Sequence, residues 1–162
     1  MPRLAADSLR DGPDSMIAVV QRVARADVGV GGSIIGAIDQ GLLVLACAEP
    51  QDTDAIADKL IHKLLKLRIF ADEQGKMNRS VVDVNGGLMI VSQFTLAADV
   101  SGGNRPSFTG AAGPELGRAL YERLLTTARA LHPIVAAGEF GADMQVSLVN
   151  DGPVTIPITL RG

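Results

Sequence analysis

The sequence predicts a mixed α/β domain with two main helices packed outside its strands. Short runs rich in Val, Ile and Leu occur near both ends of the chain and in its middle, as buried strands require. Two longer segments carry apolar residues at the spacing of an amphipathic helix. The length of 162 residues fits one domain with its own core. Strands separated by two helices favour a mixed α/β arrangement.

Composition narrows the class of protein. With 47% hydrophobic and 3% aromatic residues, the core must be mostly aliphatic. A net charge of -3 argues against nonspecific nucleic-acid binding over the whole surface, although one local basic stripe would suffice for RNA. The single cysteine, Cys47, excludes an intramolecular disulfide and lies in an apolar run, where we expect a buried and inert thiol. No apolar run is long enough to span a membrane, and we expect a cytoplasmic protein.

The first half of the chain is mostly β. Residues 1–15 mix Pro and Gly with three Asp, so we expect a loose N-terminal extension, or an upstream start codon, before a single domain at 16–162. Residues 17–23 and 26–30 predict two strand segments. Gly31-Gly32 predicts a hairpin turn, after which residues 33–38 form the returning strand. The apolar run 42–48 predicts a central strand.

A helix is expected over residues 53–67, capped by Asp52 or Thr53. Its apolar face consists of Ile56, Ala57, Leu60, Ile61, Leu64 and Leu67. His62 lies on the opposite face, where a solvated side chain is expected. Residues 67–70 then predict a short strand, and residues 71–85 predict a polar connection.

The stretch 87–99 organises the second half, because it opens as a strand buried on both faces and then presents polar side chains. A turn-rich loop follows over 100–108. Gly113 and Pro114 begin a second helix with an apolar stripe of Leu116, Leu120, Leu124 and Leu131, which ends at His132-Pro133. Segments 134–137, 144–149 and 154–160 predict three final strands, with a turn at 150–153 between the last two.

Ser92, Gln93 and Thr95 are the residues that draw attention to a site. Polar groups at the end of a buried strand are costly unless they are satisfied, so they mark either a strand that reaches the surface or the wall of a binding site. The chain has no zinc-ligand spacing, phosphate-binding loop, dinucleotide fingerprint or nucleophile elbow. We therefore expect no metal and no cofactor. A site of this composition can bind and orient through main-chain N–H groups but offers no obvious base.

Six motifs in one order carry a resemblance to a known family. They are Val20-Gln21-Arg22-Val23, Lys76-Met77-Asn78, Ser92-Gln93-Phe94-Thr95-Leu96, Arg105-Pro106-Ser107-Phe108, Gly138-Glu139-Phe140-Gly141-Ala142-Asp143-Met144 and Asn150-Asp151-Gly152-Pro153-Val154-Thr155. Together they resemble the D-aminoacyl-tRNA deacylase family, formerly D-tyrosyl-tRNA deacylase, over residues 16 to about 160. Two features depart from it: the leader, and Ser101-Gly102-Gly103, where family members usually have a Lys-containing loop.

The resemblance implies a barrel-like fold of two β-layers with helices outside, and a homodimer. It implies hydrolysis of the ester between a D-amino acid, or glycine, and the terminal adenosine of tRNA. Main-chain N–H groups at Phe94 and Thr95 would hold the ester carbonyl, and water would attack with help from the adenosine 2′-hydroxyl. We interpret Thr95 as part of the wall rather than as a nucleophile, because no partner that could deprotonate it is visible.

The remaining site residues also come from the resemblance. Ser92 and Gln93 would seat the adenosine, and Phe140 and Met144 would line its pocket. Gly152-Pro153 resembles a cis element that excludes L-amino acids from the other subunit's site, and Arg22 would brace it. Two alternatives stay open: a non-catalytic binding module of the same fold, or a synthetase-type editing domain that acts in trans.

Overall fold

The computed structural model describes residues 15–161. In chain order the elements are β1 (Ser15–Val30), β2 (Ser33–Ile38), β3 (Gly41–Ala48), α2 (Asp54–Lys66), β4 (Phe70–Ala71), β5 (Met77–Arg79), β6 (Gly87–Ser92), the 3-10 helix η1 (Phe94–Ala97), α3 (Pro114–Leu131), β7 (Val135–Ala137) and β8 (Gln145–Arg161). The predicted leader lies outside the described residues, except for Ser15, which begins β1 and pairs with Arg161. No helix among residues 15–161 is long and apolar enough to cross a membrane.

Strand β1 is hydrogen-bonded along both edges. One edge pairs with β8 from Ser15 to Gly29, and the other pairs first with β3, from Met16 to Val23, and then with β2, from Ala26 to Val30. The prediction of two separate segments is wrong, because β1 is one strand of 16 residues that changes partner along one edge. Every other strand of the main sheet is therefore placed directly or indirectly by β1.

Strand β8 also corrects the sequence prediction. Instead of two strands joined by a turn, it is one strand of 17 residues. Opposite Arg22 the register shifts, so that β1 advances from Gln21 to Val23 while β8 runs from Thr155 to Asn150. Gly and Pro usually mark a turn, but Gly152 and Pro153 lie in a bulge, a group of extra residues within β8. The parts of β8 before and after the bulge both pair with β1. The segment 151–153 therefore projects from the middle of a long strand.

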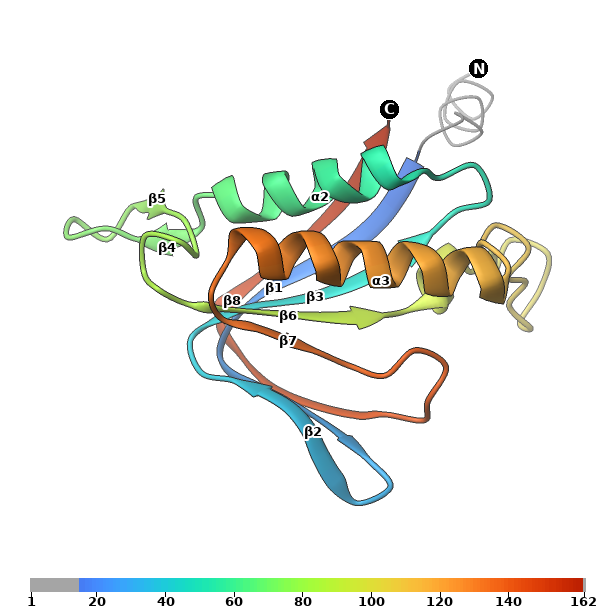
Figure 1. The fold of residues 1–162 in the computed structure, drawn as a ribbon, viewed down its shortest axis with the longest axis horizontal. Coiled ribbons are helices and arrows are strands. Elements are labelled where there is room, and N and C mark those ends of the chain that lie inside the picture. The colour runs from blue at the N-terminus through green and yellow to red at the C-terminus, as the bar shows by residue number, and fades with distance from the viewer. Residues whose placement is uncertain (1–14, 162) are drawn as a thin grey trace.

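The sheet closes almost completely on itself. Its strand order is β2-β1-β3-β6-β7, and β3, β6 and β7 run parallel to one another. Strand β8 pairs with the opposite edge of β1 from the one that pairs with β3 and β2. At the far ends, a Cβ added to Gly36 of β2 would lie 2.9 Å from the carbonyl oxygen of Ala137 in β7. Figure 1 shows the curled sheet with α2 and α3 side by side on one face. The predicted mixed α/β fold with a barrel-like sheet and two outer helices is confirmed.

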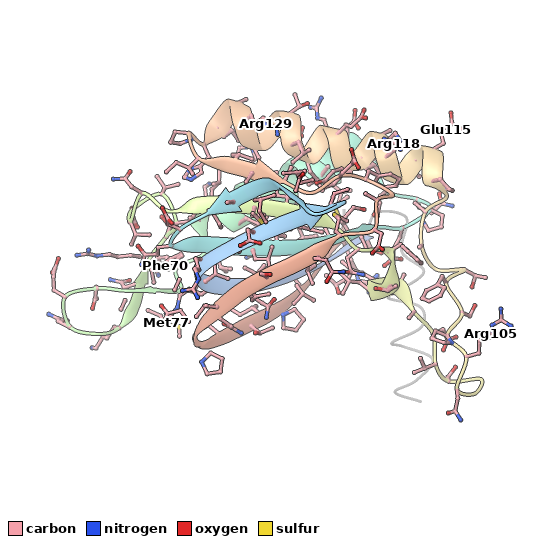
Figure 2. All side chains as sticks on the ribbon, turned by 90° about the horizontal axis from the view of Figure 1, so that it is seen from below. Phe70, Met77, Arg105, Glu115, Arg118 and Arg129 are labelled. Carbon is pink, nitrogen blue, oxygen red and sulfur yellow. The ribbon has the colours of Figure 1, made fainter. Side chains whose placement is uncertain are left out.

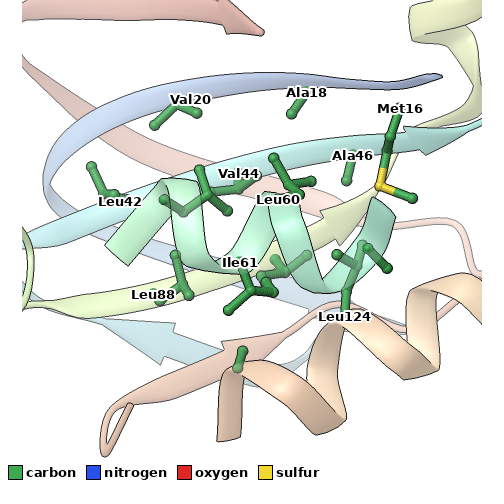
Figure 3. Packing of buried hydrophobic residues seen from close by; sticks show 14 of the residues in the cluster. Met16, Ala18, Val20, Leu42, Val44, Ala46, Leu60, Ile61, Leu88 and Leu124 are labelled. Carbon is green, nitrogen blue, oxygen red and sulfur yellow. The ribbon is translucent and has the colours of Figure 1, made fainter. Parts of the chain in front are cut away.

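Alternation along the strands divides the core in two. Leu42 and Val44 of β3 face the helices together with Leu88 and Ile90 of β6, as Figure 3 shows for several of these side chains. The intervening side chains fill the inside of the barrel. This inner cluster comprises Val23, Ala26, Val28, Ile38, Leu43, Met89 and Val91. Because β3 and β6 are covered on both faces, their sequences are continuously apolar.

The helices lie close to where they were predicted. Thr53 occupies the N-cap position of α2, without a side-chain capping bond, and Pro114 is the first residue of α3. His62 is exposed, as expected. Leu131, however, is 47% exposed at the last turn of α3, and His132 is buried, with Nε2 2.7 Å from the Gly86 carbonyl oxygen. The helix therefore ends against the sheet through a histidine rather than through the predicted leucine.

The segment between α2 and β6 is more ordered than predicted. The expected strand at 67–70 is displaced to Phe70–Ala71, and it pairs with β5, which lies inside the predicted polar connection. The hairpin has few residues in each strand, too few for alternation to appear in the sequence.

Asp58 links the two helices. Its carboxylate accepts hydrogen bonds from Arg123 Nε (2.9 Å), Arg123 Nη2 (2.7 Å) and Thr127 Oγ1 (2.6 Å) of α3. The hydrogen bond from Arg123, followed by the one from Thr127, lowers the pKa of Asp58 to about 2. Since the pKa is lower in the folded protein, the pair stabilises the fold above the ordinary carboxyl pKa, and this contribution is lost as the pH falls toward 2.

We expect Asp58→Asn to lower the free energy of unfolding at pH 7 by about 1 kcal/mol, a value reduced for the partial exposure of the pair. The difference from the wild type should shrink between pH 4 and pH 2. Chemical denaturation across this range measures both effects. Asp39→Asn, at an exposed carboxylate in the β2–β3 turn, is the control. A pH-independent defect in Asp58→Asn would contradict the assigned role.

Candidate functional site

A pocket of about 660 Å³ opens where β6 ends. Its walls are formed by the end of β6 and the start of η1, by the loop before α3, and by the segment that leads from β7 into β8. The lining residues are Val91, Ser92, Gln93, Phe94, Phe108, Ala111, Ala112, Gly113, Pro114, Phe140, Gly141, Ala142, Asp143, Met144 and Val146. The pocket thus brings together Ser92, Gln93, Phe94, Phe140 and Met144, five expected site residues from two motifs that lie far apart in the sequence.

The floor of the pocket is set by main-chain hydrogen bonds. The stretch 87–99 opens as the expected buried strand, β6, which ends at Ser92; the Gln93 N–H then donates to the Ala46 carbonyl at 2.8 Å and η1 begins. Phe94 and Thr95 are the first two residues of η1, and the first N–H groups of a helix have no acceptor within it. Two main-chain donors are therefore available beside the pocket, at positions fixed by β3 and β6.

Thr95 adjoins the pocket but does not line it. Its hydroxyl oxygen accepts a hydrogen bond from the side-chain amide of Gln93. Among residues 15–161 no histidine, lysine or carboxylate is hydrogen-bonded to this hydroxyl. Nothing in the described structure is therefore placed to remove its proton.

Phe140 forms the wall next to α3. The Arg118 guanidinium lies 4.9 Å from the centre of its ring, and the Tyr121 ring lies 6.1 Å away. The Tyr121 hydroxyl oxygen is 2.8 Å from the carbonyl oxygens of both Ile90 and Gly138, so it ties α3 to β6 and to the segment before Phe140. Burial raises the pKa of Tyr121 to about 12, which keeps this hydroxyl a donor at neutral pH.

Met144 depends on Gly138 for its space. A Cβ on that glycine would lie only 2.7 Å from the Met144 sulfur. A side chain at position 138 would therefore push the methionine from its place in the wall.

Cys47 lies behind the pocket and is buried, as predicted. Its sulfur is 3.7 Å from the Phe94 carbonyl oxygen. Burial, followed by the nearby Glu49 charge, raises the pKa of the thiol to about 11. The group is therefore a neutral packing element at physiological pH.

Gly152 and Pro153 do not reach this pocket. They lie in the β8 bulge opposite Arg22, near the end of the sheet where Val23 pairs with Gly41, whereas Ser92 lies beside Ala46 at the other end. Gly41 and Ala46 are five residues apart on β3, which corresponds to about 16 Å along the strand. The Gly152-Pro153 peptide bond is cis, the isomer that the resemblance implies.

Arg22 holds the main chain next to this bond. Its Nε donates to the Asp151 carbonyl at 3.0 Å, and its Nη1 donates to the Ile69 carbonyl at 2.7 Å. The side chain therefore links the bulge to the start of the β4–β5 segment.

Sequence reasoning missed part of the pocket. Phe108 and the stretch 111–114 form its outer wall, but they come from a loop without periodicity. The motif that contains Phe108 supported the family resemblance and received no role. Within residues 15–161 there is no group of three or more His, Cys, Asp or Glu side chains that could hold a metal ion.

Comparison with known proteins gives consistent results. A family model described as D-Tyr-tRNA(Tyr) deacylase matches residues 19–159. The chain is 70% identical over 145 residues to a D-aminoacyl-tRNA deacylase of Methylibium petroleiphilum, with 90% of this chain and 95% of the relative covered. It is 68% identical to the deacylase of Variovorax paradoxus, with 90% and 99% covered.

Two solved structures are also similar. One, titled c-Myc DNA Unwinding Element Binding Protein, superposes with a TM-score of 0.83 at 43% identity and covers 88% of this chain and 97% of that one. The other, titled as a probable eukaryotic D-amino acid tRNA deacylase, has a TM-score of 0.79 at 16% identity, with 90% and 100% covered. At that identity the second match shows the shared fold alone.

We expect Cys47 to resist alkylation in the folded protein. With a pKa of about 11, roughly one thiol in a thousand is ionised at pH 8, and the sulfur is also shielded. Iodoacetamide labelling, followed by intact-mass spectrometry, should be at least about a hundredfold slower in the native protein than in urea. Equal rates in the two states would contradict a buried, neutral thiol.

Proposed function

We propose a specific reaction for this chain, which belongs to the D-aminoacyl-tRNA deacylase family and is a hydrolase of that kind. It releases D-amino acids, and glycine from mischarged tRNA, by hydrolysing the ester bond to the terminal adenosine. The finer parts of the proposal concern the way in which the pocket binds the ester, the attacking group and the origin of chiral selection. We expect the enzyme to act in the cytoplasm, where aminoacyl-tRNA is used.

The observation that carries the proposal is a pocket with an apolar wall, a polar floor and free main-chain donors. Phe140 and Met144 offer a surface on which an adenine ring can stack, and Ser92 and Gln93 supply polar groups beside it. The N–H groups of Phe94 and Thr95 lie at the end of this floor and would donate hydrogen bonds to the ester carbonyl oxygen. Donors fixed by secondary structure would stabilise the oxyanion without reorganisation.

The attacking group in this proposal is water. No histidine, lysine or carboxylate of the described residues is hydrogen-bonded to the Thr95 hydroxyl, and its oxygen already accepts a hydrogen bond from Gln93. The adenosine 2′-hydroxyl, which only an RNA substrate carries, would assist the attack by water next to the ester. Thr95 would then shape the wall of the site and take no covalent part in the reaction.

Chiral selection would come from a second copy of the chain. The Gly152-Pro153 bulge lies about 16 Å from the pocket of its own chain along the strand direction, so it would act on the pocket of its partner in a homodimer. There its backbone would occupy the space that the side chain of an L-amino acid needs. Glycine and D-amino acids would avoid this clash, and the amino-acid side chain itself would not be read.

The direct test is a deacylation assay that compares one D-aminoacyl-tRNA with its L counterpart and with glycyl-tRNA. Hydrolysis of the D and glycyl substrates, with the L substrate spared, supports the proposal. Equal rates for the D and L substrates would overturn chiral selection, and no hydrolysis of either would overturn the activity.

We expect Thr95→Ala to retain measurable deacylation, because the residue has no chemical role in the proposed mechanism. Replacement of the terminal 2′-hydroxyl by hydrogen should lower the rate far more, by at least about a hundredfold. Single-turnover rates with both substrates and both proteins test this ranking. A covalent aminoacyl adduct trapped on Thr95 would show instead that the residue is a nucleophile.

We expect Arg22→Gln to weaken chiral selection, because the variant loses the fork of N–H donors that holds the Asp151 and Ile69 carbonyls. The ratio of D to L deacylation rates should fall about tenfold or more. Arg25→Gln, at an exposed position of the same strand, is the matched control. If Arg22→Gln folds normally and keeps the wild-type ratio, Arg22 does not position the bulge for selection.

A further inference from the structure

The outer wall of the pocket consists of two exposed aromatic rings. Phe94 is 57% exposed and Phe108 is 37% exposed, although both line the pocket. Their ring centres are 5.1 Å apart and the ring planes meet at 74° in an edge-to-face contact. Two of the four phenylalanines in this chain therefore lie side by side at the rim of one pocket, where both are partly open to water. Such surface is costly to leave bare and is suited to a stacking partner.

The loop that carries Phe108 is held in place. Asp99 and Ser107 exchange two main-chain hydrogen bonds, of 2.7 and 2.9 Å, which close the loop at its base. Beyond this bridge the Ala111 N–H donates to the Phe108 carbonyl at 3.1 Å, and the Ala112 N–H donates to Ala48 of β3 at 2.9 Å. Phe108 is therefore fixed between two anchored points, and its ring is presented in a defined place.

Arg105 lies inside the closed loop and faces water. Figure 2 shows it at the outer side of the loop, away from the sheet. Within residues 15–161 the guanidinium has no hydrogen bond or ion pair. Arg105 is the sole cationic residue between 98 and 113. The only carboxylate there, Asp99, lies at the base and accepts two hydrogen bonds from Ser101.

Charge distinguishes this rim of the pocket from the others. The segment after Phe140 contributes the exposed Asp143 to the lining, and Glu115 follows Pro114 at the start of α3. Both carboxylates would repel a phosphate group. On the α3 side the Arg118 guanidinium is stacked on the Phe140 ring, whereas Arg105 does not line the pocket but lies three residues before Phe108 in the loop that forms this rim. A polyanion that leaves the pocket over Phe108 therefore runs toward a guanidinium that has no hydrogen bond or ion pair within residues 15–161.

We propose that Phe108 and Phe94, together with Arg105, form a second nucleotide subsite, which binds the nucleotide immediately preceding the terminal adenosine of tRNA. The inference rests on the proposed function. If the pocket holds the terminal nucleoside, the 5′ side of that nucleoside must continue into the polynucleotide, and the adjoining rim must meet the next residue. The base stacks on the exposed ring of Phe108, and Arg105 binds the connecting phosphate.

The chemistry of this rim is that of single-strand recognition. Aromatic faces stack on any base, and arginine adds a charge that follows the backbone. The subsite therefore contributes affinity for the acceptor strand without reading its sequence. It also assigns a role to the Arg105-Pro106-Ser107-Phe108 motif in a loop that lacks the usual lysine.

The test uses two non-hydrolysable probes that differ by one nucleotide. The first is 3′-(D-tyrosylamino)-3′-deoxyadenosine, and the second is the same compound extended at its 5′ side by a cytidylate. Calorimetry or fluorescence gives the ratio of their dissociation constants for each protein. For the wild type we expect the longer probe to bind about tenfold more tightly.

Three substitutions separate the contributions. Phe108→Leu keeps an apolar side chain in the loop but removes the ring, and should bring the ratio close to one, whereas Phe108→Tyr should keep it. Arg105→Gln should reduce the ratio and lower the salt dependence of binding of the longer probe by about 0.7 in log–log slope. Arg129→Gln, exposed in the last turn of α3, is the control that should change neither quantity.

The possible results separate failure of the second nucleotide subsite from failure of the proposed function. If the wild type binds both probes equally, or if Phe108→Leu weakens both in the same proportion, the second subsite does not exist. If the wild type binds neither probe, the proposed function itself fails. Should Phe108→Leu not fold, unchanged ratio and salt slope in Arg105→Gln would overturn the assignment of the phosphate contact.

Discussion

Hydrogen bonding along both edges of β1 is the constraint on which the rest of the structure depends. Through β3, the strand places β6 and the end of that strand, where the main-chain donors of Phe94 and Thr95 begin. Through β8, the same strand places the bulge at 151–153. The side chain of Arg22 points from β1 into that bulge and fastens it. One strand therefore positions both the pocket and the element proposed to select its substrate, at opposite ends of a single sheet.

The pocket derives its polarity from groups that do not titrate near neutral pH. Cys47 behind the floor and Tyr121 behind the Phe140 wall both have raised pKa values because they are buried, so each keeps its proton. What remains for a ligand is the Ser92 hydroxyl, the Gln93 side chain and the main-chain amides whose directions are fixed by β3, β6 and η1. Rigid dipoles of this kind suit the stabilisation of an oxyanion better than proton transfer does. Hydrolysis with water and a substrate hydroxyl is compatible with such a site.

Hydrophobic patterning predicted the helices and the central strands well, because α2 and α3 each bury one face and β3 and β6 are buried on both faces. It failed where structure depends on a distant partner. Gly152 and Pro153 signal a turn locally, yet their flanks form one strand because both pair with β1. The grouping of Phe140 with Ser92 followed from the family resemblance and not from spacing. Phe108 was not recognised, because a fixed loop leaves no periodic pattern in the sequence.

The distance between the pocket and the Gly152-Pro153 bulge within one chain has a consequence for regulation by mass action. On the proposed function, a lone protomer would hold the reacting groups but lack the barrier that spares L-aminoacyl-tRNA. The preference for D- over L-aminoacyl-tRNA would then depend on the enzyme concentration relative to the dissociation constant of the dimer. Dilution would lower this preference before it lowered the rate of hydrolysis. The cellular concentration of the protein would thus set how strongly D-aminoacyl-tRNA is preferred over L-aminoacyl-tRNA.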